Sequence, residues 1–253
     1  MPWTFAHPAA ILPLRKLGPI RMPLAGLVLG SLIPDLGYYI GRFDLATYAH
    51  TMAGVLFFCL PTAFILAFFL VHCRQFLLAP LPNPHRTALA HLSPQPLWPL
   101  PQAASMAASI ILGAATHLAW DAFTHVNGPA VKALPLLREV VFVFGNHPFP
   151  AYNLLQHFST LLGLLILSIS YNRWLKRSTP PGISLGQGNL ICYVRLCIAA
   201  LLSIFLGFIF AFLSAKQGIP TSNILIRGIL NTTVVFLLTY IALALRTRST
   251  SPR

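Results

Sequence analysis

The chain has 253 residues, of which 56% are hydrophobic and only 8% are charged. So few charged side chains cannot cover the surface of a water-soluble fold, and a mean hydropathy of +0.73 indicates a polytopic membrane protein. Lysine and arginine outnumber aspartate and glutamate by 17 to 4, an excess that in a membrane protein favours anionic lipid headgroups over nucleic acid as the partner.

The N-terminal segment, residues 8–16, is expected to form a short helix that descends into the protein and turns at residues 17–19. Such a re-entrant hairpin would return His7 to the level of Asp35. It would have to be covered by protein, because irregular backbone is tolerated at membrane depth only inside a bundle or along a polar cavity.

Apolar runs long enough to cross a bilayer as helices recur along the chain. The first, residues 22–40, is interrupted by Pro34 and Asp35, so it is either a span that ends near Asp35 or a helix broken there. Five further runs are uninterrupted. We therefore expect an all-α integral membrane bundle of about six spans. The five uninterrupted runs are residues 51–71, 103–120, 153–171, 196–215 and 228–245.

Two further features concern the organisation of the chain. Residues 74–102 contain seven prolines, which predicts an extended, solvent-exposed loop. Nearly all histidines and acids precede the last two spans. We therefore divide the chain into a His/Asp-bearing helical core, residues 1–175, and two C-terminal transmembrane helices, residues 176–253.

The distribution of lysine and arginine predicts the orientation. In a six-span arrangement, 12 of these residues fall on one side of the membrane and 5 on the other. Because cytoplasmic loops carry the excess of positive charge, the C-terminus should be cytoplasmic. The opposite, charge-poor face is non-cytoplasmic.

The sharpest local pattern is a His-x3-Asp-x3-His run formed by His117, Asp121 and His125. At 3.6 residues per turn these positions follow one helix face, so neighbouring side chains can meet at one cation. Imidazole and carboxylate are the usual ligands of zinc and related divalent ions. The run therefore indicates a metal or catalytic site.

The other candidate residues lie at span ends on the same charge-poor face. They are Asp35, His50 and His157, and His7 would join them through the re-entrant hairpin. Asp44 follows Arg42 closely, which predicts an ordinary surface ion pair instead.

A structural explanation of the same residues stays open. An ionisable group within a span costs about 2.5 to 3.5 kcal/mol on insertion scales, and a His–Asp hydrogen bond between helices would offset that cost without a metal. A non-enzymatic scaffold would use the set in this way. A transporter would instead need polar residues along a path through both halves of the bilayer.

Four segments together resemble the bacterial membrane proteins of domain-of-unknown-function family 4184. The resemblance covers residues 1–175 or more, and it implies a multi-pass protein of the bacterial inner membrane. It carries no activity with it, since that family has none established. The segments are residues 1–10 with His7, 30–35, 50–54 and 113–125.

The order of these residues is also distantly similar to that in membrane-bound metal-dependent hydrolases and in the soluble zinc-dependent phospholipase C and P1-nuclease superfamily. On that resemblance, His7 would join a neighbouring metal through Asp121. The soluble enzymes have a His-x3-Glu pair that this sequence lacks, so the resemblance implies one or two metals. The main zinc site would consist of Asp35, His50, His117 and Asp121, with His125 and His157 as candidates for a further ion.

The implied chemistry is phosphoester hydrolysis. A bound metal lowers the pKa of its water towards ~7 and stabilises charge on a phosphoryl oxygen, and Asp35 or Asp121 would orient that water. A site at the level of the headgroups would meet membrane lipids first. A phospholipid or lipid-linked phosphate is therefore the expected substrate.

Overall fold

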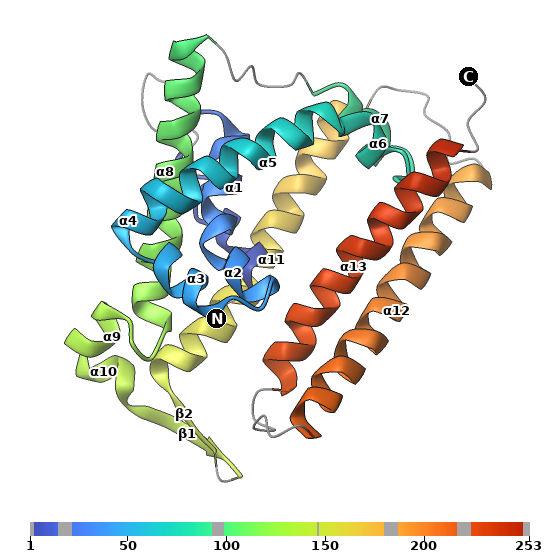
Figure 1. Ribbon diagram of the computed structural model, residues 1–253. Helices are drawn as coiled ribbons and strands as arrows, with labels where there is room; N and C mark the ends of the chain where they lie inside the picture. Colours follow the sequence, from blue (N-terminus) through green and yellow to red (C-terminus); the bar gives the residue numbers. More distant parts are fainter. Residues whose placement is uncertain are drawn as a thin grey trace. The chain divides into compact units, whose positions relative to one another are not determined.

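The computed structural model of the chain describes residues 3–14, 22–92, 99–145, 147–179, 187–216 and 224–249. The fold is mostly helical (Figure 1). The prediction of a helical membrane protein is confirmed, with the segment Leu24–Tyr39 as a shorter apolar element. Five segments of the described chain are long and apolar enough to cross a membrane: Met52–His72, Leu100–Ala133, Ala151–Ser178, Asn189–Ser214 and Ile224–Thr247.

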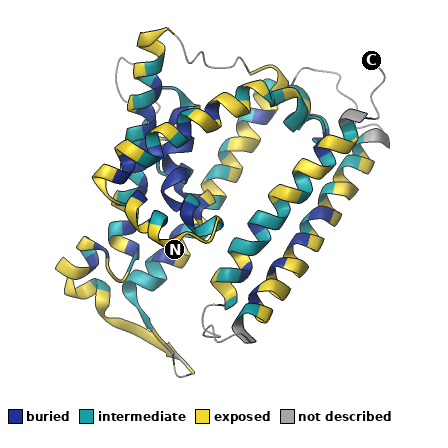
Figure 2. Cartoon of the chain, viewed as in Figure 1, coloured by how far each residue is buried: buried dark blue, intermediate teal, exposed yellow. Residues whose placement is uncertain are grey.

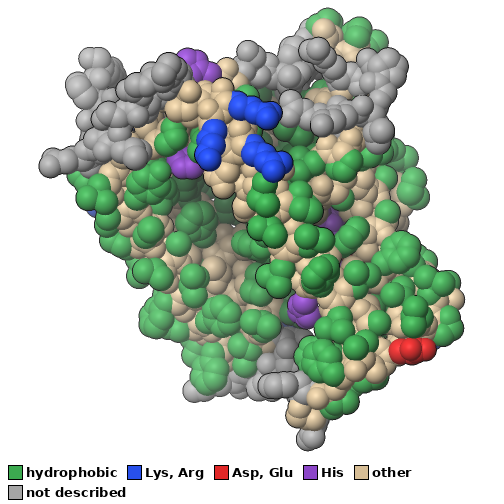
Figure 3. All heavy atoms as spheres, turned by 180° about the vertical axis from the view of Figure 1, so that it is seen from behind, with side chains coloured by type: hydrophobic (Ala, Val, Ile, Leu, Met, Phe, Trp, Pro, Cys, Tyr) green, Lys and Arg blue, Asp and Glu red, His purple; other side chains and the backbone are tan. Residues whose placement is uncertain are grey.

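Most apolar side chains of these helices point outwards. Only 11% of the most apolar window of Ala151–Ser178 is buried, and 22% of that of Ile224–Thr247. Both helices are largely yellow and teal in Figure 2, and hydrophobic side chains dominate the face shown in Figure 3, where charged ones are few. A surface of this kind suits contact with lipid, because exposed apolar patches of such extent are rare on soluble monomers.

The chain divides into two compact units. Unit 1 consists of Met1–Gly37, Arg42–Phe68 and Gln95–Arg173, and unit 2 consists of Tyr38–Gly41, Phe69–Pro94 and Trp174–Arg253. All the candidate site residues belong to unit 1. The functional division between residues 175 and 176 stays a prediction.

Unit 1 begins with a 3-10 helix, η1 (Thr4–Ala9), followed by turns as far as Leu14. The expected helix over residues 8–16 is therefore wrong in its type and its start, since Pro8 already lies inside η1. The predicted reversal at residues 17–19 lies outside the described residues. His7 is buried, which agrees with an N-terminal segment covered by the rest of the unit.

The first apolar run is a broken helix. It consists of α1 (Leu24–Leu32), the 3-10 turn η3 (Ile33–Asp35) and the short helix α2 (Leu36–Tyr39). Pro34 lacks an amide hydrogen and cannot continue the α-helical hydrogen bonding, so the break falls where the proline stands. The break buries Asp35 at the junction.

The second run follows a short helix, α3 (Phe43–Ala49), that ends at His50. Thr51 then caps a new helix, accepting a hydrogen bond from the amide of Gly54 at 3.0 Å. This helix comprises α4 (Met52–Gly54), the π-helical turn η4 (Val55–Cys59) and α5 (Leu60–His72).

Helix α8 (Leu100–Thr124) packs closely against α1 in unit 1. A Cβ atom at Gly30 would overlap the carbonyl of Ile110, and one at Gly113 would overlap the carbonyl of Leu27. These two glycines therefore permit the backbones to approach, as small residues do between membrane helices. The same contact places the C-terminal half of α8 beside the end of α1.

The expectation of an extended, exposed loop over residues 74–102 is wrong for the described part. It contains the helices α6 (Arg74–Leu78) and α7 (His85–Ala90). The prolines at 80, 82 and 84 lie between these helices, and those at 99 and 101 lie at the start of α8, where a missing amide hydrogen costs nothing. Arg74 also stabilises the fold of this part by donating hydrogen bonds to the carbonyls of Leu89 and Ala90.

After α8 come α9 (Pro129–Ala133), α10 (Pro135–Arg138) and a β-hairpin that the sequence analysis missed. Its strands, β1 (Val140–Phe144) and β2 (His147–Pro150), pair antiparallel, and Gly145 has a φ of +59°. Valine and phenylalanine favour strands, and glycine supplies the left-handed conformation of the tight turn.

Three long helices complete the chain: α11 (Ala151–Ser178), α12 (Gln187–Lys216) and α13 (Ile224–Ser249). Helices α12 and α13 lie side by side in unit 2 (Figure 1).

Candidate metal centre

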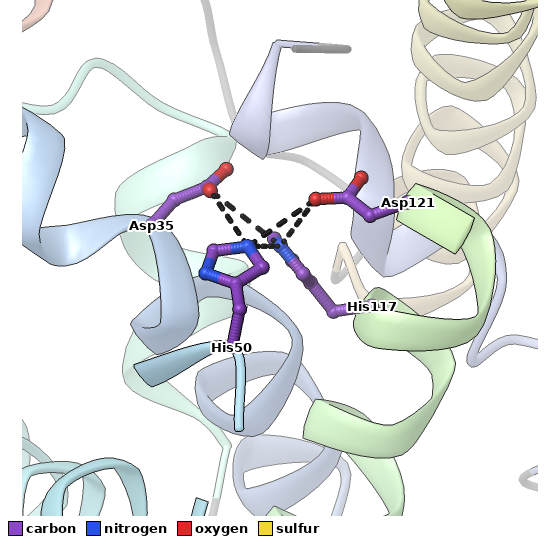
Figure 4. A group of neighbouring side chains, drawn as sticks. All are labelled: Asp35, His50, His117 and Asp121. Atoms are coloured by element: carbon purple, nitrogen blue, oxygen red, sulfur yellow. Dashed lines mark hydrogen bonds and ion pairs between the residues drawn. The ribbon is translucent and has the colours of Figure 1, made fainter. Parts of the chain in front are cut away.

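Four side chains that are far apart in the sequence converge in unit 1 (Figure 4). Asp35 comes from η3, His50 follows α3, and His117 and Asp121 lie one turn apart on α8. Each offers one ligand atom, and the four atoms all lie within 4.8 Å of one another. This group of four could hold a metal ion. Asp35, His117 and Asp121 are buried, and His50 is the most exposed member of the group.

The distances within the group are nearly uniform. His50 Nε2 lies 3.2 Å from His117 Nε2, and both nitrogens lie 3.3 Å from Asp121 Oδ2. Asp35 Oδ1 lies 3.5 Å from His117 Nε2 and 3.6 Å from His50 Nε2. Five of the six separations between the four atoms therefore fall between 3.2 and 3.6 Å.

These five separations are close to those between the ligand atoms of a tetrahedral zinc site. Zinc binds imidazole nitrogen and carboxylate oxygen at about 2.0 to 2.2 Å, which places the ligand atoms of a tetrahedron about 3.3 to 3.6 Å apart. Two histidines with two carboxylates are also a donor set that zinc accepts. The residues present therefore fit a divalent metal.

The second nitrogen of each histidine selects the tautomer of the neutral ring. His50 Nδ1 lies 2.7 Å from the carbonyl of Ala46, and His117 Nδ1 lies 2.8 Å from the carbonyl of Ser31. A carbonyl only accepts hydrogen bonds, so Nδ1 carries the hydrogen and a neutral ring presents the lone pair of Nε2 to the group. Backbone carbonyls orient metal-binding histidines in this way in many proteins.

With both rings neutral, two nitrogen lone pairs and two carboxylate oxygens would face one another with no hydrogen between them. Asp35 Oδ1 is buried without a hydrogen-bond partner among the described residues. Four acceptors in this arrangement repel one another unless positive charge lies between them. A metal cation supplies that charge, and so would one or two protons on the histidines.

The second oxygen of Asp121 faces a different pair of histidines. Asp121 Oδ1 lies 3.6 Å from His7 Nε2 and 3.4 Å from His125 Nδ1. Both Oδ1 and His7 Nε2 are buried without a hydrogen-bond partner among the described residues. Asp121 is therefore placed between the group of four and a second pair of imidazoles, which brings together the residues that the His-x3-Asp-x3-His run singled out.

His7 reaches the group from η1. Its ring stacks on that of His117, with centroids 3.9 Å apart and planes at 24°. Burial lowers the pKa of His7 to about 3, with a further contribution from His117. The imidazole is therefore neutral near pH 7, which is the form that binds metals.

Thr4 is a residue that the sequence analysis missed. Its hydroxyl donates a hydrogen bond to Asp35 Oδ2, so one oxygen of that carboxylate is held by η1 while the other faces the histidines. Thr4 stands one helical turn before His7, but no pattern in the sequence relates either residue to Asp35. The hydrogen bond between Thr4 and Asp35 is therefore visible only in the folded structure.

Two candidates behave differently from the rest. His157 is exposed on α11 and does not belong to the group of four. Asp44 pairs with Arg42 at 2.7 Å on the surface, as predicted, and the hydrogen bonds from Arg42 lower the pKa of Asp44 to about 2.

With this geometry established, the chain can be placed in a family. It matches the family described as Domain of unknown function (DUF4184) over residues 1–247 and belongs to that family. Comparison with curated proteins gives no match, and neither does comparison with solved structures.

Proposed function

We propose that this chain is a metal-dependent phosphoester hydrolase of the bacterial inner membrane that acts on a phospholipid or a lipid-linked phosphate. The observation that carries the proposal is the convergence of two Nε2 atoms and two carboxylate oxygens, with five of their six separations at 3.2 to 3.6 Å. Zinc is the metal that this spacing favours. Bound there, it would supply a water of lowered pKa and a positive charge for a phosphoryl oxygen.

A catalytic zinc keeps one coordination position open, whereas four protein ligands are typical of structural zinc. One carboxylate must therefore hold the reacting water instead of the metal. Asp121 is better placed for this role than Asp35. Its second oxygen already faces His7 and His125, while the second oxygen of Asp35 is held by Thr4. We accordingly assign His50, His117 and Asp35 to metal binding and Asp121 to orienting the water.

His7 and His125 are further candidate ligands. Both face Asp121 Oδ1, so a second cation there would lie beside Asp121, whose other oxygen faces the group of four. His157, which is exposed, is retained only as a candidate for a more peripheral ion. The proposal requires one metal at the group of four and permits a second beside His7.

The membrane setting supports a lipid substrate. The helices around the site expose apolar surface along most of their length, so lipids are the molecules nearest to unit 1. The 12 to 5 asymmetry of lysine and arginine supports a cytoplasmic C-terminus and a site on the non-cytoplasmic face.

A second candidate function, a non-enzymatic scaffold, is favoured by one observation. The group of four joins η3, the end of α3 and α8, so protons shared among its members would bind these segments together without a metal. This alternative predicts a purified protein without stoichiometric metal.

The experiment that separates the two is elemental mass spectrometry of detergent-purified protein never exposed to chelator. We expect about one zinc or more per chain in the wild type and in the control His91→Ala, whose residue is exposed after α7. The double variant His117→Ala, Asp121→Asn should lose the metal together with hydrolysis of phospholipid and lipid-phosphate substrates. Equal, negligible metal in all three proteins would favour the scaffold.

A further inference from the structure

A cavity of about 180 Å³ lies in unit 1 between η1, α8 and α11. Ala6, Ala9 and Ala10 form its wall on the η1 side, and Leu162, Gly163 and Ile166 form the wall on α11. Gly163 permits this arrangement, because a Cβ atom there would come within 2.9 Å of the carbonyl of Ala6. The walls are therefore close, apolar and built largely from small residues.

The cavity opens towards the apolar exterior of the helices. Leu162 and Ile166 are 42% and 39% exposed, and α11 is the least buried of the five candidate spans. In a bilayer, the medium at such a surface is the hydrocarbon of lipid chains. On α8, the Trp120 indole donates a hydrogen bond to the Ser159 hydroxyl at 3.2 Å, which fixes one side of the cavity.

His7 also lines the cavity. Its imidazole stacks on His117, and its Nε2 lies 3.6 Å from Asp121 Oδ1. His7 therefore borders both the apolar cavity and the group of four. A mostly apolar cavity bordered by a few polar groups is typical of sites that bind small ligands.

We propose that this cavity holds the first part of a single alkyl or isoprenyl chain of a lipid phosphate whose phosphate group lies at the metal centre. The inference rests on the proposed function for the identity of the headgroup. The volume supports one chain, because a cavity of about 150 Å³ accommodates benzene, whereas ligands of drug size need about 300 Å³ or more. The substrate class is thus a lipid phosphate that enters sideways from the bilayer.

The test uses the full-length protein in lipid nanodiscs and a photoreactive hexadecyl phosphate, with the labelled peptides identified by mass spectrometry. We expect labelling of η1 and α11 in the wild type. Ala10→Phe fills the cavity and should reduce this labelling by about tenfold, in the range that a blocked apolar pocket produces. Ala108→Phe, on an exposed position of α8, is the matched control and should label as the wild type does.

If Ala10→Phe does not fold, Leu162→Trp narrows the cavity from α11 and should lower the labelling in the same sense. A second arm uses a photoreactive isoprenyl phosphate, and stronger labelling by one probe than by the other identifies the chain type. Label on other segments, or equal labelling of Ala10→Phe and Ala108→Phe, would overturn the proposal.

Turnover keeps this result separate from the proposed function. If the wild type is labelled at η1 and α11 but hydrolyses neither long-chain nor short-chain phosphates, the proposed chain site is supported and the proposed hydrolase activity is refuted. If the wild type hydrolyses both phosphates equally well and is labelled elsewhere, the proposed hydrolase activity is supported and the proposed chain site is refuted. In the expected case, Ala10→Phe lowers the ratio of long-chain to short-chain hydrolysis by about tenfold.

Discussion

His50 and His117 face each other through their Nε2 atoms at 3.2 Å, while their Nδ1 atoms both face main-chain carbonyls. Two neutral rings cannot form a hydrogen bond in this orientation, because neither Nε2 carries a hydrogen. The pair therefore needs a cation or an added proton. Since the carbonyls of Ala46 and Ser31 belong to helical backbone, the fold itself holds both rings in the metal-binding tautomer.

Removal of the metal should destabilise the wild type and leave Asp35→Asn, which lacks the metal-binding carboxylate, unchanged. A ligand that binds only the folded state stabilises it by about 2.7 kcal/mol at one hundred times its Kd, and for a chain of this size that corresponds to roughly 5 to 10 °C in Tm. We expect the Tm of wild-type protein in detergent to fall by this amount when a chelator is added. Asp35→Asn should show a low Tm that the chelator does not change.

Asp44→Asn provides the control for the loss of a carboxylate. Asp44 lies on the surface with Arg42, and such exposed pairs contribute at most about 1 kcal/mol. This variant should respond to the chelator as the wild type does. A chelator effect of the same size in Asp35→Asn would mean that the metal is bound elsewhere.

Gly113→Ala should separate α1 from α8 and disturb the metal centre. Alanine stabilises a helix by about 1 kcal/mol relative to glycine. However, the added Cβ would overlap the main-chain carbonyl of Leu27, and no side-chain rotation can relieve that overlap. Overpacking of this kind costs about 1 to 3 kcal/mol. We therefore expect a lower Tm and less bound metal, measured by thermal unfolding and by elemental mass spectrometry.

The comparison for this variant is Ala115→Leu, which adds a larger side chain to an exposed position of the same helix. Its Tm and metal content should remain near the wild-type values. Gly113→Ala with unchanged stability and metal would show that the two helices can separate without moving His117.

The sequence predicted the helices and the members of the site better than it predicted their connections. Long apolar runs define spans by length alone, and the helical period places His117 and Asp121 on one face. Those inferences depend on neighbours in the sequence. The convergence of Asp35 and His50 with α8 depends on long-range packing, for which Gly30 and Gly113 are the physical cause.

The incorrect or missing predictions also have physical reasons that can be given residue by residue. Residues 74–92 appeared too rich in proline for helices, yet the prolines stand between α6 and α7. The strand β1 was missed although Val140–Phe144 consists of β-branched and aromatic residues before a glycine. Thr4 and the carbonyl of Ser31 could not be found from the sequence, because serine and threonine are common and main-chain carbonyls carry no sequence signal.

The stability of the metal-free protein should fall with acid because of His7. Its folded-state pKa of about 3 lies below the ordinary value of 6.5, so the unfolded chain takes up the proton first. The contribution of neutral His7 is complete above pH 6.5 and is lost as the pH falls from 6.5 towards 3, by up to about 1.4 kcal/mol per pH unit. Chemical unfolding of chelated protein at several pH values measures this slope.

His7→Asn is the comparison, because asparagine does not titrate in this range. The difference in unfolding free energy between the wild type and the variant should shrink as the pH falls below 6.5. Parallel pH profiles for the two proteins would mean that His7 is accessible to protons in the folded state.

Cysteine labelling in intact bacterial cells tests the orientation. In a variant without the four native cysteines, Asp44→Cys should react with a membrane-impermeant maleimide, because the first turn of α3 is assigned to the non-cytoplasmic face with the site. Arg86→Cys, in α7, should react only after permeabilisation, since the excess of lysine and arginine assigns that segment to the cytoplasm. Ala114→Cys is fully buried and controls for non-specific reaction, so it should label in neither condition. The reverse pattern at 44 and 86 would move the metal centre to the cytoplasmic face and would make cytoplasmic-leaflet lipids the substrates to test.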